Sequence, residues 1–332
     1  MLKVKEVSFS AIREQQWTEL VRKSRCASFF QTHNWIKLWL AHFEKTLEKT
    51  LILAVYAGDV LVGIGPFAIK NHSIAFITLT EINEQQTISD YGDIIALVSQ
   101  EKIIWEALVS KLIQLTKKHS YTIKLDYLCE HSVSYAILRD MYHDDLEQME
   151  VAPKIPLPRD WLMYLLGLPS HKRHEVKRKM KMCIQEGLQL NRAIINASTL
   201  HEYVQLVEGD NQQKNQFFSK AMLGFFIDLL HQPDVELFFL YHKTSVIASL
   251  IVFHYKDAFL AYNSSYKLNF SHFSPGLVLF ELVIQQAIQS RMLGFDFLRG
   301  CERYKYDLGA VDQKLFGLSS LRPLSSLHQG QI

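Results

Sequence analysis

The chain has 332 residues, enough for two domains of ordinary size, and its 48% hydrophobic and 21% charged residues are typical of a folded protein with a large core. This composition excludes a disordered or fibrous chain. The net charge of +2 gives no overall reason to expect nucleic acid or acidic lipid as a partner, so any anion-binding surface must be local and stable DNA binding is not expected.

The four cysteines form no Cys-x-x-Cys pair and the fourteen histidines show no metal-ligand spacing, so we expect reduced thiols and no bound metal. Residues 1–6 carry charges where a secretory signal needs an apolar core. No stretch reaches the roughly 18 apolar residues of a membrane span. These features predict a cytoplasmic chain with no membrane span.

The first half of the chain predicts a defined order of elements. Hydrophobic periodicity indicates helices over 14–22 and 34–43, strands over 51–56, 60–69 and 74–79, a helix over 101–118 and a strand over 121–128. The second half repeats this order, with helices over 200–207 and 220–230, strands over 236–241, 245–254 and 258–266, a helix over 277–293 and a strand at 295. Such a repeat indicates one fold used twice.

The connection between the two copies, residues 151–158, has three prolines, which disfavour regular ladders and indicate an extended linker. We therefore predict an N-terminal domain over 1–155 and a C-terminal domain over 156–332. The polar end of the chain, 325–332, is expected to be frayed.

Side chains suited to chemistry gather between residues 295 and 310. Asp296 interrupts an apolar strand, and its burial is costly unless the carboxylate is paired or catalytic. Pairing with Arg299 or Lys305 is the structural alternative to catalysis. Tyr304 and Tyr306 follow in the same segment and are suited to proton donation.

Three further places carry candidate residues. An apolar helix begins with Ser274, Pro275 and Gly276. These residues are either an ordinary helix cap or a helix start whose free N–H groups bind a pyrophosphate. The run 171–181 has six Lys or Arg on a helix whose predicted buried stripe is Val176, Met180, Cys183 and Ile184. Beside that stripe, Arg173 and Lys177 face either solvent or an anionic partner. A cluster of acidic and aromatic residues follows the third strand, at Asp90, Tyr91 and Asp93. This cluster is either a solvated loop or a binding site for the ammonium group of an acceptor.

The doubled order of three strands, a helix and a strand resembles two N-acetyltransferase (GNAT) folds, as in the Fem group of aminoacyl ligases and related bacterial acyltransferases. The segments 294–297 and 304–309 are similar to the C-terminal signature of that group, although Leu308 stands where an aromatic residue is usual. The segments 30–35 and 89–93 look like the polysaccharide-associated acyltransferase branch. The resemblance covers nearly the whole chain.

This resemblance implies an α/β (α+β) chain of two tandem GNAT folds, each a mixed, mostly antiparallel sheet flanked by helices. It implies that the donor pyrophosphate binds at the helix start formed by Ser274, Pro275, Gly276 and Leu277. Lys305 matches a lysine that stabilises negative charge near the reacting carbonyl. From the residue types alone, Tyr304 or Tyr306 is the candidate proton donor to a thiolate leaving group, and Asp296 is a support or a base. Arg173 and Lys177 match a basic helix of the substrate channel, and Arg299 is a further candidate for substrate binding.

The leading hypothesis is an N-acyltransferase that uses acetyl-CoA or another acyl-CoA as co-substrate. Its acceptor would be an amine on a small molecule or on a glycan or peptide precursor of the cell envelope, entering between the domains. The alternative is a Fem-like ligase that takes an aminoacyl group from transfer RNA. A catalytically silent scaffold is a third possibility, because the usual Arg/Gln-x-x-Gly-x-Gly/Ala loop does not precede the helix at 277.

Overall fold

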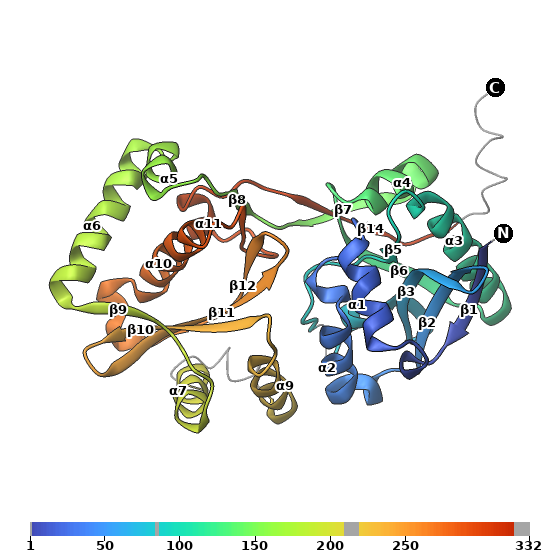
Figure 1. Cartoon of the computed structure of the whole chain (residues 1–332), viewed down its shortest axis with the longest axis horizontal. Coiled ribbons are helices and arrows are strands. Elements are labelled where there is room, and N and C mark those ends of the chain that lie inside the picture. Colours follow the sequence, from blue (N-terminus) through green and yellow to red (C-terminus); the bar gives the residue numbers. More distant parts are fainter. Residues whose placement is uncertain (1, 84–85, 209–218, 322–332) are drawn as a thin grey trace. The chain divides into compact units, whose positions relative to one another are not determined.

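The computed structural model describes residues 2–83, 86–208 and 219–321 (Figure 1). It divides the chain into two compact units. The first unit holds the chain up to Val151 and the segment that begins at Gln313, and the second unit holds the residues from Ala152 to Asp312.

The first unit is built on a mixed sheet whose strands follow the order β1-β2-β3-β4-β6-β14-β7, with β5 paired to β3. The pair β4–β6 is parallel and the other pairs are antiparallel. The elements of this unit are β1 (Leu2–Val7), α1 (Glu14–Lys23), α2 (His33–Phe43), β2 (Lys49–Ala57), β3 (Val60–Lys70), β4 (Ser73–Phe76), β5 (Ile95–Ala96), α3 (Glu101–His119), β6 (Thr122–Cys129), α4 (Val133–Tyr142), β7 (Leu146–Val151) and β14 (Lys314–Leu318).

The second unit has a sheet of the order β8-β13-β12-β11-β10-β9, in which only the pair β12–β13 is parallel among the described strands. Its elements are β8 (Lys154–Pro156), α5 (Trp161–Gly167), α6 (Ser170–Glu186), β9 (Leu188–Arg192), α7 (Ala197–Val207), α9 (Lys220–Leu230), β10 (Val235–His242), β11 (Ser245–Tyr255), β12 (Ala258–Tyr266), α10 (Pro275–Gln289), β13 (Gly294–Asp296) and α11 (Arg303–Asp307).

The two sheets share one plan, because β2, β3, β4, α3 and β6 follow each other as β10, β11, β12, α10 and β13 do. In both units a helix returns the chain to a strand parallel to the third one, since parallel neighbours need a long crossover. The helix and sheet of the first unit approach closely at Gly63, where a Cβ atom would lie 2.7 Å from Ile104 Cγ2. The predicted mixed α/β class and its repeat are confirmed.

The edges of the sheets differ from the predicted division at residue 155. The end of the predicted linker forms β8, which pairs with β13, and β14 returns from the end of the second unit to pair with β6 and β7. A strand needs only a partner edge, whatever its distance in sequence, so proline-containing β8 occupies the edge of its sheet. The predicted frayed end, 325–332, lies outside the described residues.

Both faces of the second sheet are covered, with α10 on one face and α7 and α9 on the other (Figure 1). The alternation of side chains along each strand explains the continuous apolar runs, because neighbouring residues reach opposite cores. Thus Phe238 and Leu240 join the core that contains Val278 of α10. On the other side, Tyr262 of β12 stacks with Phe226 of α9, with ring centroids 5.8 Å apart.

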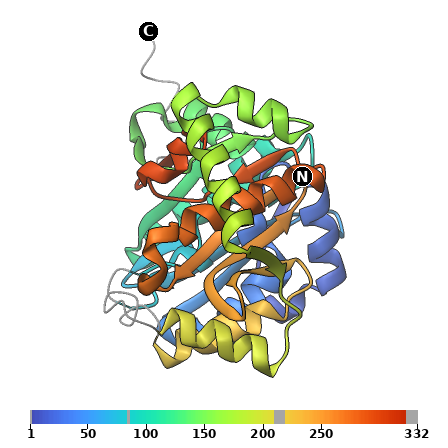
Figure 2. The same cartoon turned by 90° about the vertical axis from the view of Figure 1, so that its left-hand side faces the viewer.

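The helix α6 crosses α10 within the second unit (Figure 2), and its buried side differs from the predicted stripe. Val176, Lys179 and Cys183 are buried, whereas Ile184 is 84% exposed. The buried positions follow spacings of three and four residues, which place them on one face of the helix. Ile184 lies one position past that face, close to the left-handed Gly187 that ends the helix.

Candidate active site

Three chain segments meet at one edge of the second sheet. Because β12 and β13 are parallel, the residues that follow each strand lie at the same edge. The helix α10 connects the end of β12 to the start of β13, so its first turn lies there too. We call this region, formed by the end of β12, the first turn of α10 and the loop after β13, the carboxyl edge.

The strand β12 separates from β13 at the carboxyl edge. The pairing covers only Ala258 to Leu260, while β12 continues to Tyr266. A bulge falls at this point, since Ile251 pairs with Asn263 and Val252 pairs with Ala261, so that Tyr262 is the extra residue. Beyond the bulge, β12 has backbone groups that face away from β11 and that β13 does not pair.

Buried polar atoms lie in the same part of the sheet. Asn263 Oδ1 and Ser249 Oγ are buried and, within the described residues, have no hydrogen-bond partner. Ser265 is also buried and stands directly opposite Ser249. Unpartnered buried polar atoms are uncommon and call for an explanation such as a ligand. Sequence reasoning missed these residues, although the polar run 263–265 interrupts an otherwise apolar strand.

The first turn of α10 presents free backbone donors. Ser274 is the N-cap residue of α10, as predicted, but it has φ of 54° and its side chain makes no capping hydrogen bond. Pro275 has no N–H, and the N–H groups of Gly276 and Leu277 precede the first intrahelical bond, from Val278 N–H to the Ser274 carbonyl at 3.1 Å. The missing side chain of Gly276 leaves its backbone open beside Tyr266, whose Cδ1 would lie 3.4 Å from a Cβ atom.

Lys305 is 2% exposed and is held by the loop after β13. Its Nζ donates hydrogen bonds to the carbonyls of Arg299 at 2.7 Å and Gly300 at 3.1 Å, with the Leu298 carbonyl at 3.5 Å. Glu302 Oε2 lies 2.9 Å from the same ammonium group. Leu298 and Gly300 have φ of 58° and 106°, so this amine stabilises a loop of unusual backbone conformation.

Asp296 is 4% exposed, and both of its carboxylate oxygens make supporting contacts. Its Oδ1 accepts a hydrogen bond from the Leu298 N–H at 2.8 Å, and its Oδ2 lies 3.1 Å from Lys154 Nζ. The lysine comes from β8, a strand that the sequence did not predict. These contacts give Asp296 the geometry of a support for the loop.

The two tyrosines of α11 differ in their surroundings. Tyr304 packs against Phe280 with ring centroids 5.1 Å apart, and burial raises the pKa of its hydroxyl. The Tyr306 hydroxyl donates a hydrogen bond to Asp312 Oδ1 at 2.7 Å. Desolvation and then this hydrogen bond raise the pKa of Tyr306 to about 12. Both hydroxyls therefore remain protonated at neutral pH.

The lysines of the basic helix α6 pair with acids of α11 and of α6 itself. Lys172 Nζ lies 2.8 Å from Asp307 Oδ2, and buried Lys179 lies 3.6 Å from Glu175 Oε1. Lys177 is exposed and Arg173 is half-buried. The helix therefore combines cations fixed by pairing with cations that remain available.

The remaining predicted residues belong to the first unit. Asp93 is 3% exposed and accepts hydrogen bonds from the Ser134 hydroxyl and from the Ile94 N–H, the latter at 2.7 Å. The Tyr91 carbonyl accepts a hydrogen bond from Gln31 Nε2 at 2.9 Å. Asp90 is half-buried and is the most exposed of the three. Asp93 thus supports the loop that carries Asp90.

Comparisons with known proteins agree with this architecture. A model of the acetyltransferase (GNAT) domain matches residues 170–306, and no curated protein matches the sequence. Three solved structures resemble the chain over nearly its whole length. FemX is 11% identical with a TM-score of 0.64, over 97% of this chain and 99% of its own. The L-PGS of Bacillus licheniformis is 10% identical with a TM-score of 0.57, over 94% and 93%. A tandem GNAT protein from the clavulanic acid biosynthesis pathway is 12% identical with a TM-score of 0.52, over 96% and 98%.

At these identities the solved structures establish the fold. The predicted resemblance to tandem GNAT proteins and to the Fem group is confirmed, and the chain has an acyltransferase-type fold. No described helix combines the length and hydropathy required to cross a membrane. Over the same residues, no group of three His, Cys, Asp or Glu side chains is arranged to hold a metal ion.

Proposed function

We propose that the protein is an N-acyltransferase that moves an acyl group from an acyl-CoA, such as acetyl-CoA, to an amine. The observation that carries this proposal is the first turn of α10, where Gly276 and Leu277 offer free N–H groups beside the separated end of β12. A helix start of this kind binds phosphate oxygens through its N–H groups and its dipole. The unpartnered Asn263 Oδ1 would accept a hydrogen bond from an amide N–H of the donor.

The transfer itself needs few groups. The neutral amine attacks the thioester carbonyl, the new C–N bond forms, and the C–S bond breaks as the thiolate leaves. Backbone N–H groups beyond the bulge at Tyr262 would stabilise the oxyanion. The nitrogen loses one proton as the amide forms. Tyr304, whose hydroxyl is protonated at neutral pH, would return a proton to the thiolate and would regain one from the nitrogen. Lys305 would contribute a positive charge and hold the loop after β13 in place, and Asp296 would orient the same loop.

The acceptor in this proposal is an amine of a small molecule or of a glycan or peptide precursor, as in the cell envelope. Within the second unit, Arg173 and Lys177 would bind an anionic part of this acceptor, and Arg299 would contribute from the loop after β13. Within the first unit, Asp90 and Tyr91, supported by Asp93, would bind an ammonium group.

A measurement of thermal unfolding tests the donor half of the proposal. Acetyl-CoA or a longer acyl-CoA at 100 times its Kd should stabilise the folded protein by about 2.7 kcal/mol. Desulfo-CoA with the same pyrophosphate should stabilise it comparably, and acetyl-pantetheine, which lacks the pyrophosphate, should not. Absence of any shift at millimolar acyl-CoA would reject the proposal and leave a scaffold without donor binding.

A second candidate is a ligase that uses aminoacyl-tRNA, favoured by exposed cations on α6. Lys177, Arg178 and Lys181 are exposed, and no ion pair engages them within the described residues. Contact with RNA phosphates would make transfer RNA binding steeply dependent on salt concentration. Binding that is steep in salt and lost in a triple Gln variant would favour the ligase, whereas the acyl-CoA transferase should show no such binding.

A further inference from the structure

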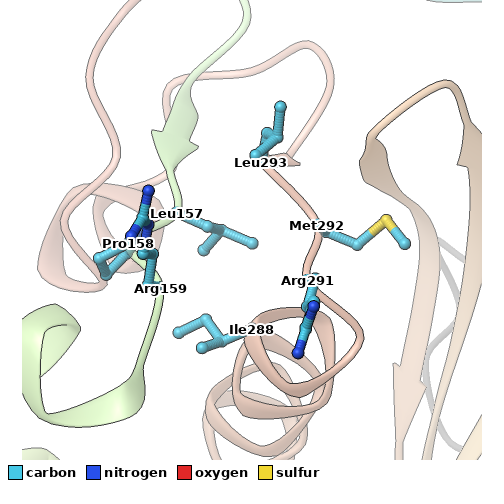
Figure 3. A pocket seen from close by; sticks show the side chains of 7 residues that line it. All are labelled: Leu157, Pro158, Arg159, Ile288, Arg291, Met292 and Leu293. Atoms are coloured by element: carbon cyan, nitrogen blue, oxygen red, sulfur yellow. The ribbon is translucent and has the colours of Figure 1, made fainter.

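A cavity of about 470 Å³ lies in the second unit at the end of α10 opposite to the carboxyl edge (Figure 3). The two ends of this 15-residue helix are roughly 22 Å apart, at 1.5 Å per residue. The cavity is therefore separate from the proposed donor site. Its volume falls within the range of about 300–1,000 Å³ that is usual for small-molecule sites.

The cavity combines an apolar surface with two cations. Its lining residues are Leu157, Pro158, Arg159, Ile288, Arg291, Met292 and Leu293. Figure 3 shows Leu157 and Ile288 between the two arginines, which flank the cavity on opposite sides. No acidic side chain lines it. Elsewhere in the described residues, neither guanidinium group has an ion-pair partner.

The nearest acid in sequence does not neutralise this charge. Asp160 follows Arg159, but its Oδ1 accepts a hydrogen bond from the Met163 N–H at 2.8 Å and caps α5. The carboxylate is thereby directed to the helix start. The cavity therefore combines two guanidinium groups with an apolar surface.

Arg291 occupies a backbone position that usually belongs to glycine. After α10, its N–H donates to the Ile288 carbonyl and the Met292 N–H donates to the Ala287 carbonyl, both at 3.0 Å. This pair of bonds is the Schellman motif, whose left-handed residue is Arg291 with φ of 59°. The chain thus places an arginine where glycine would be more stable, and the motif fixes where its side chain begins.

We propose that this cavity binds a phosphate monoester that carries a hydrocarbon group. A phosphate monoester bears up to two negative charges, and guanidinium groups bind its oxygens with directed hydrogen bonds. The hydrocarbon group would pack on Leu157, Ile288 and Met292. The ligand would come either from a free metabolite or from a lipid headgroup. This inference does not rest on the proposed acyl transfer.

Calorimetric titration of the full chain with octyl phosphate, below its micelle concentration, tests the proposal. We expect saturable 1:1 binding that weakens about tenfold or more in Arg159→Gln and in Arg291→Gly. Arg291→Gly should leave the melting temperature unchanged or raise it, because glycine suits the left-handed position. Arg178→Gln, an equal charge change on exposed α6, should bind as the original protein does.

Further titrations test both halves of the ligand and its source. Inorganic phosphate and octanol should each bind at least tenfold more weakly than octyl phosphate. Sedimentation with phosphatidic acid vesicles, lost in the double arginine variant, would indicate a lipid source, and octyl phosphate binding without sedimentation would indicate a free ligand. The proposal would be overturned by no binding at millimolar octyl phosphate, or by Arg291→Gly and Arg159→Gln binding octyl phosphate as tightly as the original protein does. It would also be overturned by equal affinity of the original protein for inorganic phosphate and octyl phosphate.

Discussion

Lys154 Nζ lies 3.1 Å from Asp296 Oδ2, and the two residues stand directly opposite each other in the antiparallel pair β8–β13. The ion pair joins the linker to the strand that precedes the Lys305 loop. Because Asp296 is nearly fully buried, its charge needs this cation and the Leu298 N–H. The acid in the apolar strand is therefore bound into the structure on both of its oxygens.

The first prediction concerns this pair. Asp296→Asn keeps an acceptor for the Leu298 N–H but removes the charge, and it should lower the free energy of unfolding by about 1–3 kcal/mol. Lys154→Met should destabilise the protein further, since it removes a cation from a buried carboxylate. Urea denaturation measures both effects. The double variant should be more stable than the sum of the single losses predicts. An Asn variant of full stability without turnover would instead identify Asp296 as a base.

The second prediction concerns Lys305. Removal of its ammonium group leaves the carbonyls of Arg299 and Gly300 without their donor, so Lys305→Ala should lower the free energy of unfolding by roughly 2–4 kcal/mol. Its turnover should fall together with its stability. Arg303→Ala, an exposed position on the same helix, is the matched control and should change neither. Loss of turnover in Lys305→Ala without loss of stability would show that the amine acts on the substrate alone.

The sequence predicted the repeated part of the fold well, because it rests on local periodicity. The helices at 101–118 and 220–230 agree closely with α3 and α9. Strands β8 and β14 were missed because their partners lie far away in sequence and their own patterns are short and contain proline or glycine. Their pairing decides which unit each segment belongs to.

The candidate site was predictable as a region but not in its contacts. The residue types of the 295–310 segment identified the loop after β13, whereas the partner of Asp296 comes from 142 positions earlier in the chain, at Lys154. The run of charges on α6 gave no sign that Lys179 would be buried. Lys179 is near the Glu281 carboxyl of α10, whose pKa it lowers, and no local pattern relates that residue to α6.

The third prediction concerns the pH dependence of stability through Glu281, which is 1% exposed with an unpartnered Oε2 among the described atoms. Burial raises the pKa of this carboxyl to about 8, against the attraction of Lys179 and Arg178 and together with repulsion from Glu175. Because the pKa is raised in the folded state, the carboxyl loses its proton at a lower pH in the unfolded chain than in the folded protein. Stability from this group is therefore present below about pH 4.5 and is lost as the pH rises through 8.

Chemical denaturation of Glu281→Gln between pH 5 and 9 measures this effect. As the pH rises in that window, the free energy of unfolding of the original protein should fall by up to roughly 1.4 kcal/mol per pH unit because of Glu281, and that of the variant should not. The difference in stability in favour of the variant should therefore grow until about pH 8. Glu186→Gln, an exposed position on α6, should follow the original pH profile. A constant difference between Glu281→Gln and the original protein across the window would show that Glu281 is ionised throughout.

The fourth prediction separates donor binding from folding at Gly276. This glycine has an ordinary helical backbone, and a Cβ atom would meet Tyr266 Cδ1 at 3.4 Å, an adjustable contact. Gly276→Ala should therefore fold normally and gain up to about 0.5–1 kcal/mol of stability, because alanine loses less backbone entropy. The methyl group would nevertheless cover the N–H groups of the first turn and lower the affinity for acyl-CoA by tenfold or more. Thermal unfolding with and without acyl-CoA measures both quantities on one sample.

Gly167→Ala is the control for this prediction. A Cβ atom at Gly167 would meet nothing within 4 Å, so the substitution should leave the affinity for acyl-CoA unchanged. Equal acyl-CoA affinity in Gly276→Ala and the original protein would exclude the first turn of α10 as the pyrophosphate site.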